Sequence, residues 1–272
     1  MGRIIKLLVY FIAYQFAVFG ILAGGYMALH GTSELPGASE PAYRTMLLWG
    51  QIVFSAAVCV HLIAGKYVDG GQMSLRFPHS GKTLLASVAL IAGMGAWTNY
   101  LNELAGLPDT MKDTTEMMLN SPIGIAAVVV MAPLMEELLF RGAMQGYLPK
   151  RWKSPVWAVT LPALLFGAVH GNPAQIPFAF VTGLALGWIY YLTGSLLPAV
   201  LMHFVNNGAS VLLYHFSGNP DATIVGTLGH AGGAILALSG AALTALCVWY
   251  IKSRLLPGPP VCNESDSKTR CL

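Results

Sequence analysis

The fold is decided by the stretch Ile123-Gly-Ile-Ala-Ala-Val-Val-Val-Met-Ala-Pro-Leu-Met-Glu136-Glu137-Leu-Leu-Phe-Arg141, an apolar segment that contains two adjacent glutamates. An apolar run of about 20 residues is what an α-helix needs to cross a bilayer. A carboxylate at bilayer depth costs roughly 2.5–3.5 kcal/mol on insertion scales, so acidic residues there usually have a function. The segment therefore predicts a membrane helix that carries part of a functional site.

The composition of the whole chain agrees with this interpretation. Of the 272 residues, 55% are hydrophobic and only 10% are charged, whereas ordinary soluble domains contain about 25% charged residues. The net charge of +3 is too small to indicate a nucleic-acid partner. The four cysteines show no C-x-x-C spacing, which argues against a zinc–thiolate site or a disulfide framework. We therefore expect an all-α, polytopic membrane helix bundle that is surrounded by the lipid bilayer.

Apolar runs along the chain predict about eight transmembrane helices around a polar cavity. The expected spans are Leu7–Leu29, Met46–Ile63, Thr83–Tyr100, Ile123–Phe140, Val156–His170, Ile176–Leu192, Leu196–Tyr214 and Ala231–Ile251. The first is predicted to be an uncleaved span, because its apolar run is longer than the 7–15 residues of a typical cleaved signal. Residues 1–256 would form one integral membrane domain, and residues 257–272 a disordered cytoplasmic tail.

The distribution of basic residues predicts the orientation in the membrane. Lysines and arginines gather before the first span, between the second and third, after the fourth and after the eighth, whereas the intervening loops are acidic or weakly charged. Basic loops stay on the cytoplasmic side. We therefore expect a multi-pass protein of the cell membrane with both termini in the cytoplasm. The polar loop 102–121 is expected to carry a short amphipathic helix.

The two adjacent glutamates are expected to have different roles. Glu137 and Arg141 are four residues apart, so they share a helix face and can form an ion pair. Glu136 points about 100° away from Glu137, which leaves it free to face a cavity. The plainer alternative is a buried ion pair with a spare glutamate near the membrane interface.

Two further spans carry polar residues at the same four-residue spacing. Phe166-Gly-Ala-Val-His170 ends one span, and His203-Phe-Val-Asn206-Asn207 lies inside another. Taken alone, each group is explained by packing or by hydrogen bonding between helices. Together with Glu136 they predict a polar pocket that offers a base, a proton donor and oxyanion donors, which are the groups that hydrolysis requires. Gly183 and Gly187, a G-x-x-x-G pair, predict close helix packing.

The three motifs E-E-x-x-x-R, F-x-x-x-H and H-x-x-x-N, on separate spans and in this order, resemble the CPBP (CAAX protease, Abi or bacteriocin-processing) family of intramembrane proteases. The resemblance covers about residues 120–215 and implies an endopeptidase that acts on a peptide or on a membrane-associated or lipidated protein. It further implies that Glu136 and His170 activate water and that His203 and Asn207 stabilise the oxyanion. Glu137, Arg141 and Phe166 would support them.

The sequence leaves the cofactor and two other functions open. Catalysis is expected to proceed either without a cofactor or with a zinc ion. If zinc is used, its ligands would be Glu136, His170 and His203. The chain has no H-E-x-x-H motif, and direct glutamate-based catalysis is the preferred interpretation.

A transporter or proton-coupled carrier would also place Glu and His within the membrane. A catalytically inactive family member acting as a scaffold or immunity factor is the third possibility. The sequence specifies neither the substrate nor the oligomeric state.

Overall fold

The computed structural model describes residues 2–35, 37, 40–148, 154–217 and 223–256, and these are helical with no strand among them. The predicted tail, 257–272, lies outside the described residues. The elements in chain order are α1 (Gly2–His30), α2 (Pro41–Ala64), η1 (Gly70–Met73), α3 (Ser80–Ala105), α4 (Lys112–Leu119), α5 (Pro122–Ala126), η2 (Ala127–Met131), α6 (Ala132–Glu137), η3 (Leu138–Gln145), α8 (Pro155–Val169), α9 (Ile176–Thr193), α10 (Leu196–Ser217), α11 (Ile224–Tyr250) and η4 (Ile251–Leu255).

Seven helical segments of the described chain are long and apolar enough to cross a membrane, which confirms a multi-pass membrane protein. They match the predicted spans except for the fifth, which is the 15-residue helix α8. At 1.5 Å per residue, α8 reaches about 22 Å, short of a hydrocarbon core of about 30 Å. The expected all-α membrane helix bundle is confirmed, and α8 is the short apolar helix at the position of the fifth predicted span. The helix stops early because Gly171, with φ +64°, takes the left-handed conformation that ends helices.

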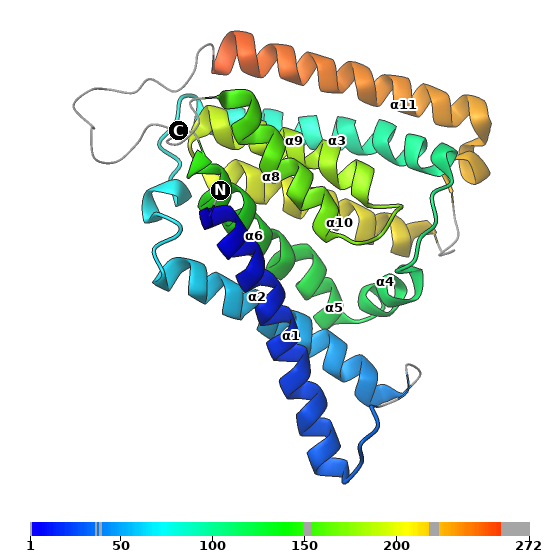
Figure 1. The fold of residues 1–272 in the computed structure, drawn as a ribbon. Coiled ribbons are helices and arrows are strands. Elements are labelled where there is room, and N and C mark those ends of the chain that lie inside the picture. Colours follow the sequence, from blue (N-terminus) through cyan, green and yellow to red (C-terminus); the bar gives the residue numbers. More distant parts are fainter. Residues whose placement is uncertain (1, 36, 38–39, 149–153, 218–222, 257–272) are drawn as a thin grey trace.

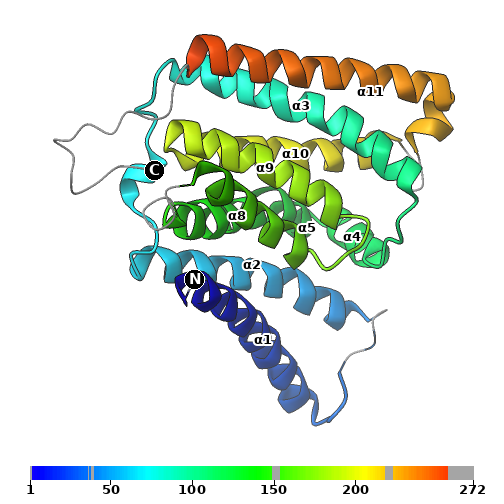
Figure 2. The same ribbon diagram turned by 45° about the horizontal axis from the view of Figure 1, so that its top comes forward.

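The helices form three groups that both ribbon views separate clearly. α1 and α2 pack together on one side, and α3 and α11 lie side by side on the opposite side (Figures 1 and 2). Between them lie the run from α5 to η3 and the helices α8, α9 and α10. The motif-bearing segments are therefore at the centre of the bundle.

The central span is not a regular α-helix. Its segments η2 and η3, on either side of α6, are π-helical, and the Ala132 amide donates to the carbonyl of Ala127, five residues earlier. Pro133 lies at the start of α6 and has no amide hydrogen to continue this pattern. π-Helical turns are rare and often accompany functional sites. The two glutamates at the end of α6 lie between two such segments.

The pair α8–α9 packs closely because of the predicted G-x-x-x-G. A Cβ atom on Gly183 would lie 3.1 Å from the Phe166 ring and 3.2 Å from Ala163, and one on Gly187 would lie 2.9 Å from Gln145. The absent side chains thus let α9 approach both α8 and the central span. The short helix expected in loop 102–121 is present as α4.

Candidate functional site

The ion pair between Glu137 and Arg141 is present and fully buried. Arg141 Nη1 donates to Glu137 Oε1 over 2.8 Å, and both side chains are 0% exposed. Arg141 Nη2 donates to the carbonyl of Gly183 on α9 over 3.1 Å. Two buried charges are tolerated when they are paired and hydrogen-bonded. The pair therefore fixes the central span to α9.

His203 of α10 lies between the two glutamates. Its Nδ1 is 2.9 Å from Glu137 Oε1, and its Nε2 is 3.7 Å from Glu136 Oε2. A carboxylate paired with arginine only accepts hydrogen bonds, so Nδ1 must carry a hydrogen. Nε2 then holds a lone pair in the neutral ring and a hydrogen only in the imidazolium form. Glu136 is the more accessible glutamate, with 18% of its side chain exposed.

His170 is oriented by its own helix. Its Nδ1 lies 2.7 Å from the Phe166 carbonyl, which can only accept, so Nδ1 is the donor and the neutral ring keeps a lone pair on Nε2. The ring is half-buried at the end of α8. No hydrogen bond or ion pair joins His170 to either glutamate among the described residues. His170 thus has a free ring nitrogen suited to accepting a proton.

Phe166 contacts both histidines and the buried arginine. Its ring centroid is 4.9 Å from that of His170 and 5.5 Å from that of His203, both edge-to-face. The Arg141 guanidinium carbon lies 4.6 Å from the same centroid, which is a cation–π contact. Phe166 therefore fixes the spacing between three polar side chains that come from three different segments.

Asn207 makes a contact that the sequence analysis did not predict. Its Nδ2 donates to the carbonyl of Val128 in η2 over 2.9 Å. Following the π-helical pattern of Ala132 with Ala127, this carbonyl would pair with the amide of residue 133. That residue is a proline without an amide hydrogen, so Asn207 supplies the missing donor. One of its two amide hydrogens is used in this way, which leaves the other for a ligand.

Gln145 belongs to this arrangement although the sequence analysis passed over it. Its buried Nε2 donates to the carbonyl of Gly187 over 2.7 Å. Arg141 and Gln145 are four residues apart, and they donate to Gly183 and Gly187, the G-x-x-x-G pair on α9 with the same interval. That matching spacing is the signal by which Gln145 is recognisable in the sequence.

Asn172 is a second residue that was missed. It is fully buried two residues after His170, and its side chain donates to Asp109 Oδ1 over 2.8 Å and accepts from the Thr110 amide over 3.2 Å. Its carbonyl also accepts from the amides that begin α9. The polar loop between α3 and α4 is thus attached to the turn that follows His170. No spacing rule links residues 62 or 63 positions apart, so the sequence alone gave no indication of it.

The residues proposed as zinc ligands do not form a metal site as they are placed. Within the described ranges, no three His, Cys, Asp or Glu side chains come close enough to hold one ion. No hydrogen bond or ion pair joins His170 to Glu136 or His203 in the described part of the chain, and both histidines contact the Phe166 ring. A three-ligand zinc site requires all three donors around one point. Glu136, His170 and His203 do not meet that requirement.

Comparisons with known proteins single out the same part of the chain. Residues 118–209 match the family model described as type II CAAX prenyl endopeptidase Rce1-like. Over 106 residues the chain is 30% identical to the membrane-embedded CAAX protease MroQ of Staphylococcus aureus (strain USA300). That match covers 37% of this chain and 42% of MroQ, so less than half of the relative is represented. No solved structure matches the chain.

Proposed function

Because this chain belongs to the CPBP family of CAAX proteases, we propose that it is an intramembrane endopeptidase. Its substrate would be a peptide or a membrane-associated or lipidated protein. The observation that carries the proposal is His203 between Glu136 and Glu137, with Glu137 held by the buried Arg141. A structural ion pair would not need the second, more accessible carboxylate, whereas hydrolysis of a peptide bond does need a base.

In the proposed reaction, Glu136 accepts a proton from a water molecule as the water oxygen attacks the peptide carbonyl carbon. His170, with its lone pair on Nε2, assists in accepting this proton and returns it to the departing amine as the C–N bond breaks. Glu137 and Arg141 do not exchange protons. They orient His203 through its Nδ1 hydrogen bond, which is the usual way in which a buried carboxylate positions an imidazole.

His203 and Asn207 are proposed to stabilise the tetrahedral oxyanion. Donation from His203 Nε2 requires the imidazolium form, because Nδ1 already donates to Glu137. Asn207 has one amide hydrogen left after its bond to Val128. Removing a single oxyanion donor typically lowers kcat by about 10²–10³, which is the size of effect expected for His203→Ala.

The decisive test compares Glu136→Gln and His170→Ala with the matched control Glu116→Gln, a glutamate on the surface of α4. Cleavage of a panel of membrane-associated peptides would be measured with purified protein in detergent. We expect a loss of about 10²–10⁴ in rate for the two site variants, as is typical when a general base is removed. The control should stay active. Full activity in either site variant would contradict the assignment, and no cleavage by the unaltered protein would favour the inactive-member alternative.

We also propose that the protein lies in the cell membrane with both termini in the cytoplasm. The support is the basic character of alternate loops. To test this orientation, a single cysteine would replace Lys66 in one variant and Glu34 in another, and each would be labelled with a membrane-impermeant thiol reagent. The two loops should be labelled from opposite sides of the membrane. Labelling of both from the same side would contradict this orientation.

A further inference from the structure

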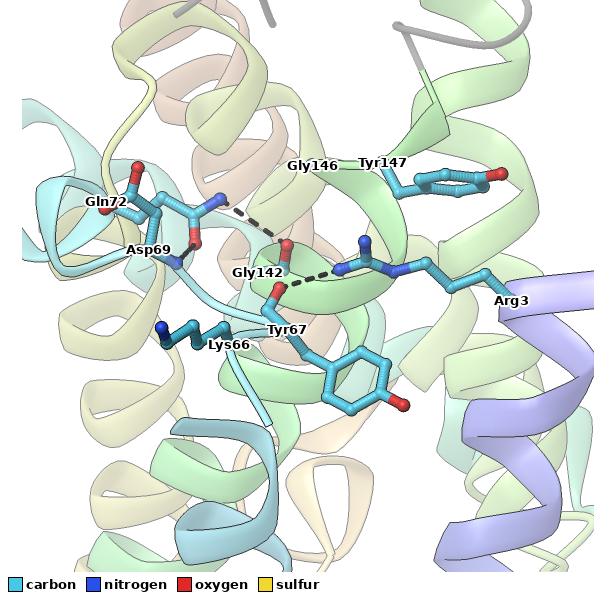
Figure 3. A pocket seen from close by; sticks show the side chains of 8 residues that line it. All are labelled: Arg3, Lys66, Tyr67, Asp69, Gln72, Gly142, Gly146 and Tyr147. Atoms are coloured by element: carbon cyan, nitrogen blue, oxygen red, sulfur yellow. Dashed lines mark hydrogen bonds between the residues drawn. The ribbon is translucent and has the colours of Figure 1, made fainter. Parts of the chain in front are cut away.

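A second polar site lies where the beginning of α1, the connection between α2 and α3, and the end of η3 meet. It is a hollow of about 140 Å³ that Arg3, Lys66, Gln72, Gly142 and Tyr147 help to line (Figure 3). None of these residues belongs to the three motifs. By the charge distribution, this is the predicted cytoplasmic end of the bundle.

Arg3 is held in place, yet most of its hydrogen-bonding capacity is unused. Its Nη2 donates to the Tyr67 carbonyl over 2.9 Å, and the guanidinium carbon lies 5.2 Å and 4.9 Å from the ring centroids of Tyr67 and Tyr147. Its Nε is buried without a hydrogen-bond partner. A guanidinium has five N–H donors, so a fixed Arg3 presents free donors to a ligand.

The cationic side chains that line this hollow outnumber its carboxylates. Neither Arg3 nor Lys66 forms an ion pair with any acidic side chain in the described part of the chain. Asp69 lines the same hollow, but its Oδ1 accepts from the Gly71 amide over 3.1 Å and thereby begins η1. The excess of positive charge in the lining, with Arg3 and Lys66 against Asp69, predicts an anionic ligand.

The surroundings of the hollow indicate what carries that anion. The two helices that lead into it expose apolar side chains, with Ile5 and Val9 of α1 each 56% exposed and Val60 and Ile63 of α2 65% and 59% exposed. In a bilayer these surfaces contact acyl chains. A ligand at their end therefore has lipid on one side and the Arg3–Lys66 hollow on the other.

We propose that this hollow binds the phosphate of an anionic phospholipid headgroup. Guanidinium groups bind phosphate through paired N–H···O bonds, and basic pockets between membrane helices are known headgroup sites. Gly142 of η3 and Gly146, which follows η3, place the end of this segment in the lining of the hollow. Binding there would join the start of α1 to η3, the segment that carries Arg141.

The test uses the full chain in nanodiscs of phosphatidylcholine with increasing amounts of phosphatidylglycerol. The variants are Arg3→Gln and Lys66→Asn, with Lys82→Asn as the matched control at the same end of the bundle. Lys66 has φ +54°, a conformation that asparagine also adopts, so this change removes charge without backbone strain. Lipid retention measured by native mass spectrometry and the rise in Tm with phosphatidylglycerol are the readouts.

We expect the unaltered protein and Lys82→Asn to bind phosphatidylglycerol equally, and each hollow variant to bind it about five-fold more weakly. If Arg3→Gln fails to fold, Lys66→Asn decides the test, because its side chain is exposed. Equal binding by Lys66→Asn and Lys82→Asn would overturn the proposal. A second measurement distinguishes a lipid headgroup from free phosphate as the ligand. Inorganic phosphate is added to the protein in nanodiscs of pure phosphatidylcholine, and the rise in Tm is compared with that caused by phosphatidylglycerol. Stabilisation equal to that by phosphatidylglycerol would overturn the lipid assignment in favour of free phosphate.

Discussion

Nδ1 of His203 lies 2.9 Å from Oε1 of Glu137, the same oxygen that accepts a hydrogen bond from Arg141. One carboxylate oxygen thus connects α10 to the central span and, through Arg141, to α9. Glu136 makes no comparable connection. His203 Nε2 lies 3.7 Å from Oε2 of Glu136, whose side chain is partly accessible. The two adjacent glutamates therefore differ in what their removal should do.

Glu137→Gln should destabilise the protein, because the buried Arg141 loses its counter-charge. Leaving one partner of a buried ion pair unpaired typically costs about 3–5 kcal/mol. Glu136→Gln should change the free energy of unfolding by no more than about 0.5 kcal/mol, as for a partly exposed side chain without such a partner. Reversible unfolding in mixed micelles measures both. Equal stabilities of the two variants would show that Glu137 is not the structural member of the pair.

The sequence predicted the Glu137–Arg141 pair because both residues lie on one helix, where spacing determines which side chains meet. It did not predict that His203 contacts Glu137, because spacing says nothing about which helices are neighbours. The bounds of the fifth predicted helix, Val156–His170, agree with those of α8 to within one residue at each end. Asn207 was predicted as a donor, but its partner Val128 depends on a π-helical turn that the sequence does not reveal.

Phe166→Ala should cost about 3–5 kcal/mol in the free energy of unfolding, the usual range for removing a buried aromatic ring. Phe166→Leu fills most of the space but loses the cation–π contact with Arg141, so a smaller cost of about 1–2 kcal/mol is expected. The cleavage rate of Phe166→Leu should still fall, because the ring also contacts His170 and His203. Phe16→Leu on the exposed face of α1 is the control and should behave like the unaltered protein. A fully active Phe166→Ala variant would contradict a positioning role.

Asn172→Ala should lower activity through His170 rather than by direct loss of a reacting group. The change removes the hydrogen bonds to Asp109 and to the Thr110 amide, each of which typically contributes about 0.5–1.5 kcal/mol. Hydrogen exchange should rise in residues 106–111 and in the turn after His170, with a fall in kcat. Asn120→Ala, at the far end of the same polar segment, loses an exposed bond to Tyr214 and should have little effect. Unchanged exchange in Asn172→Ala would refute the attachment.

Gly183→Ala should destabilise the α8–α9 contact, because the new methyl group would lie 3.1–3.2 Å from Phe166 and Ala163. Overpacking of this kind typically costs about 1–3 kcal/mol. Gly20→Ala in α1 is the matched control, since a Cβ there meets nothing within 4 Å. It should be neutral or slightly stabilising, as alanine is favoured over glycine within helices. A Gly183→Ala variant as stable as Gly20→Ala would show that α9 can move away from α8 without cost.

The structural and the chemical roles of Asn207 can be separated with Pro133. Asn207→Ala leaves the Val128 carbonyl without a donor and should cost about 0.6–1.7 kcal/mol, the range measured for hydrogen bonds between membrane helices. Pro133→Ala introduces an amide hydrogen five residues after Val128, where the π-helical turn would bring it to that carbonyl. The double variant should therefore recover the stability that Asn207→Ala loses.

Cleavage by the double variant then decides the role of Asn207 in the reaction. If Asn207 also donates to the oxyanion, the double variant is stable but remains about 10²–10³-fold slower, as for other lost oxyanion donors. Recovery of both stability and cleavage would show that Asn207 only replaces the amide hydrogen that Pro133 lacks. Because the two residues share a single acceptor, their effects on stability should be non-additive. Pro133→Ala alone keeps Asn207 available and should cleave at a rate close to that of the unaltered protein.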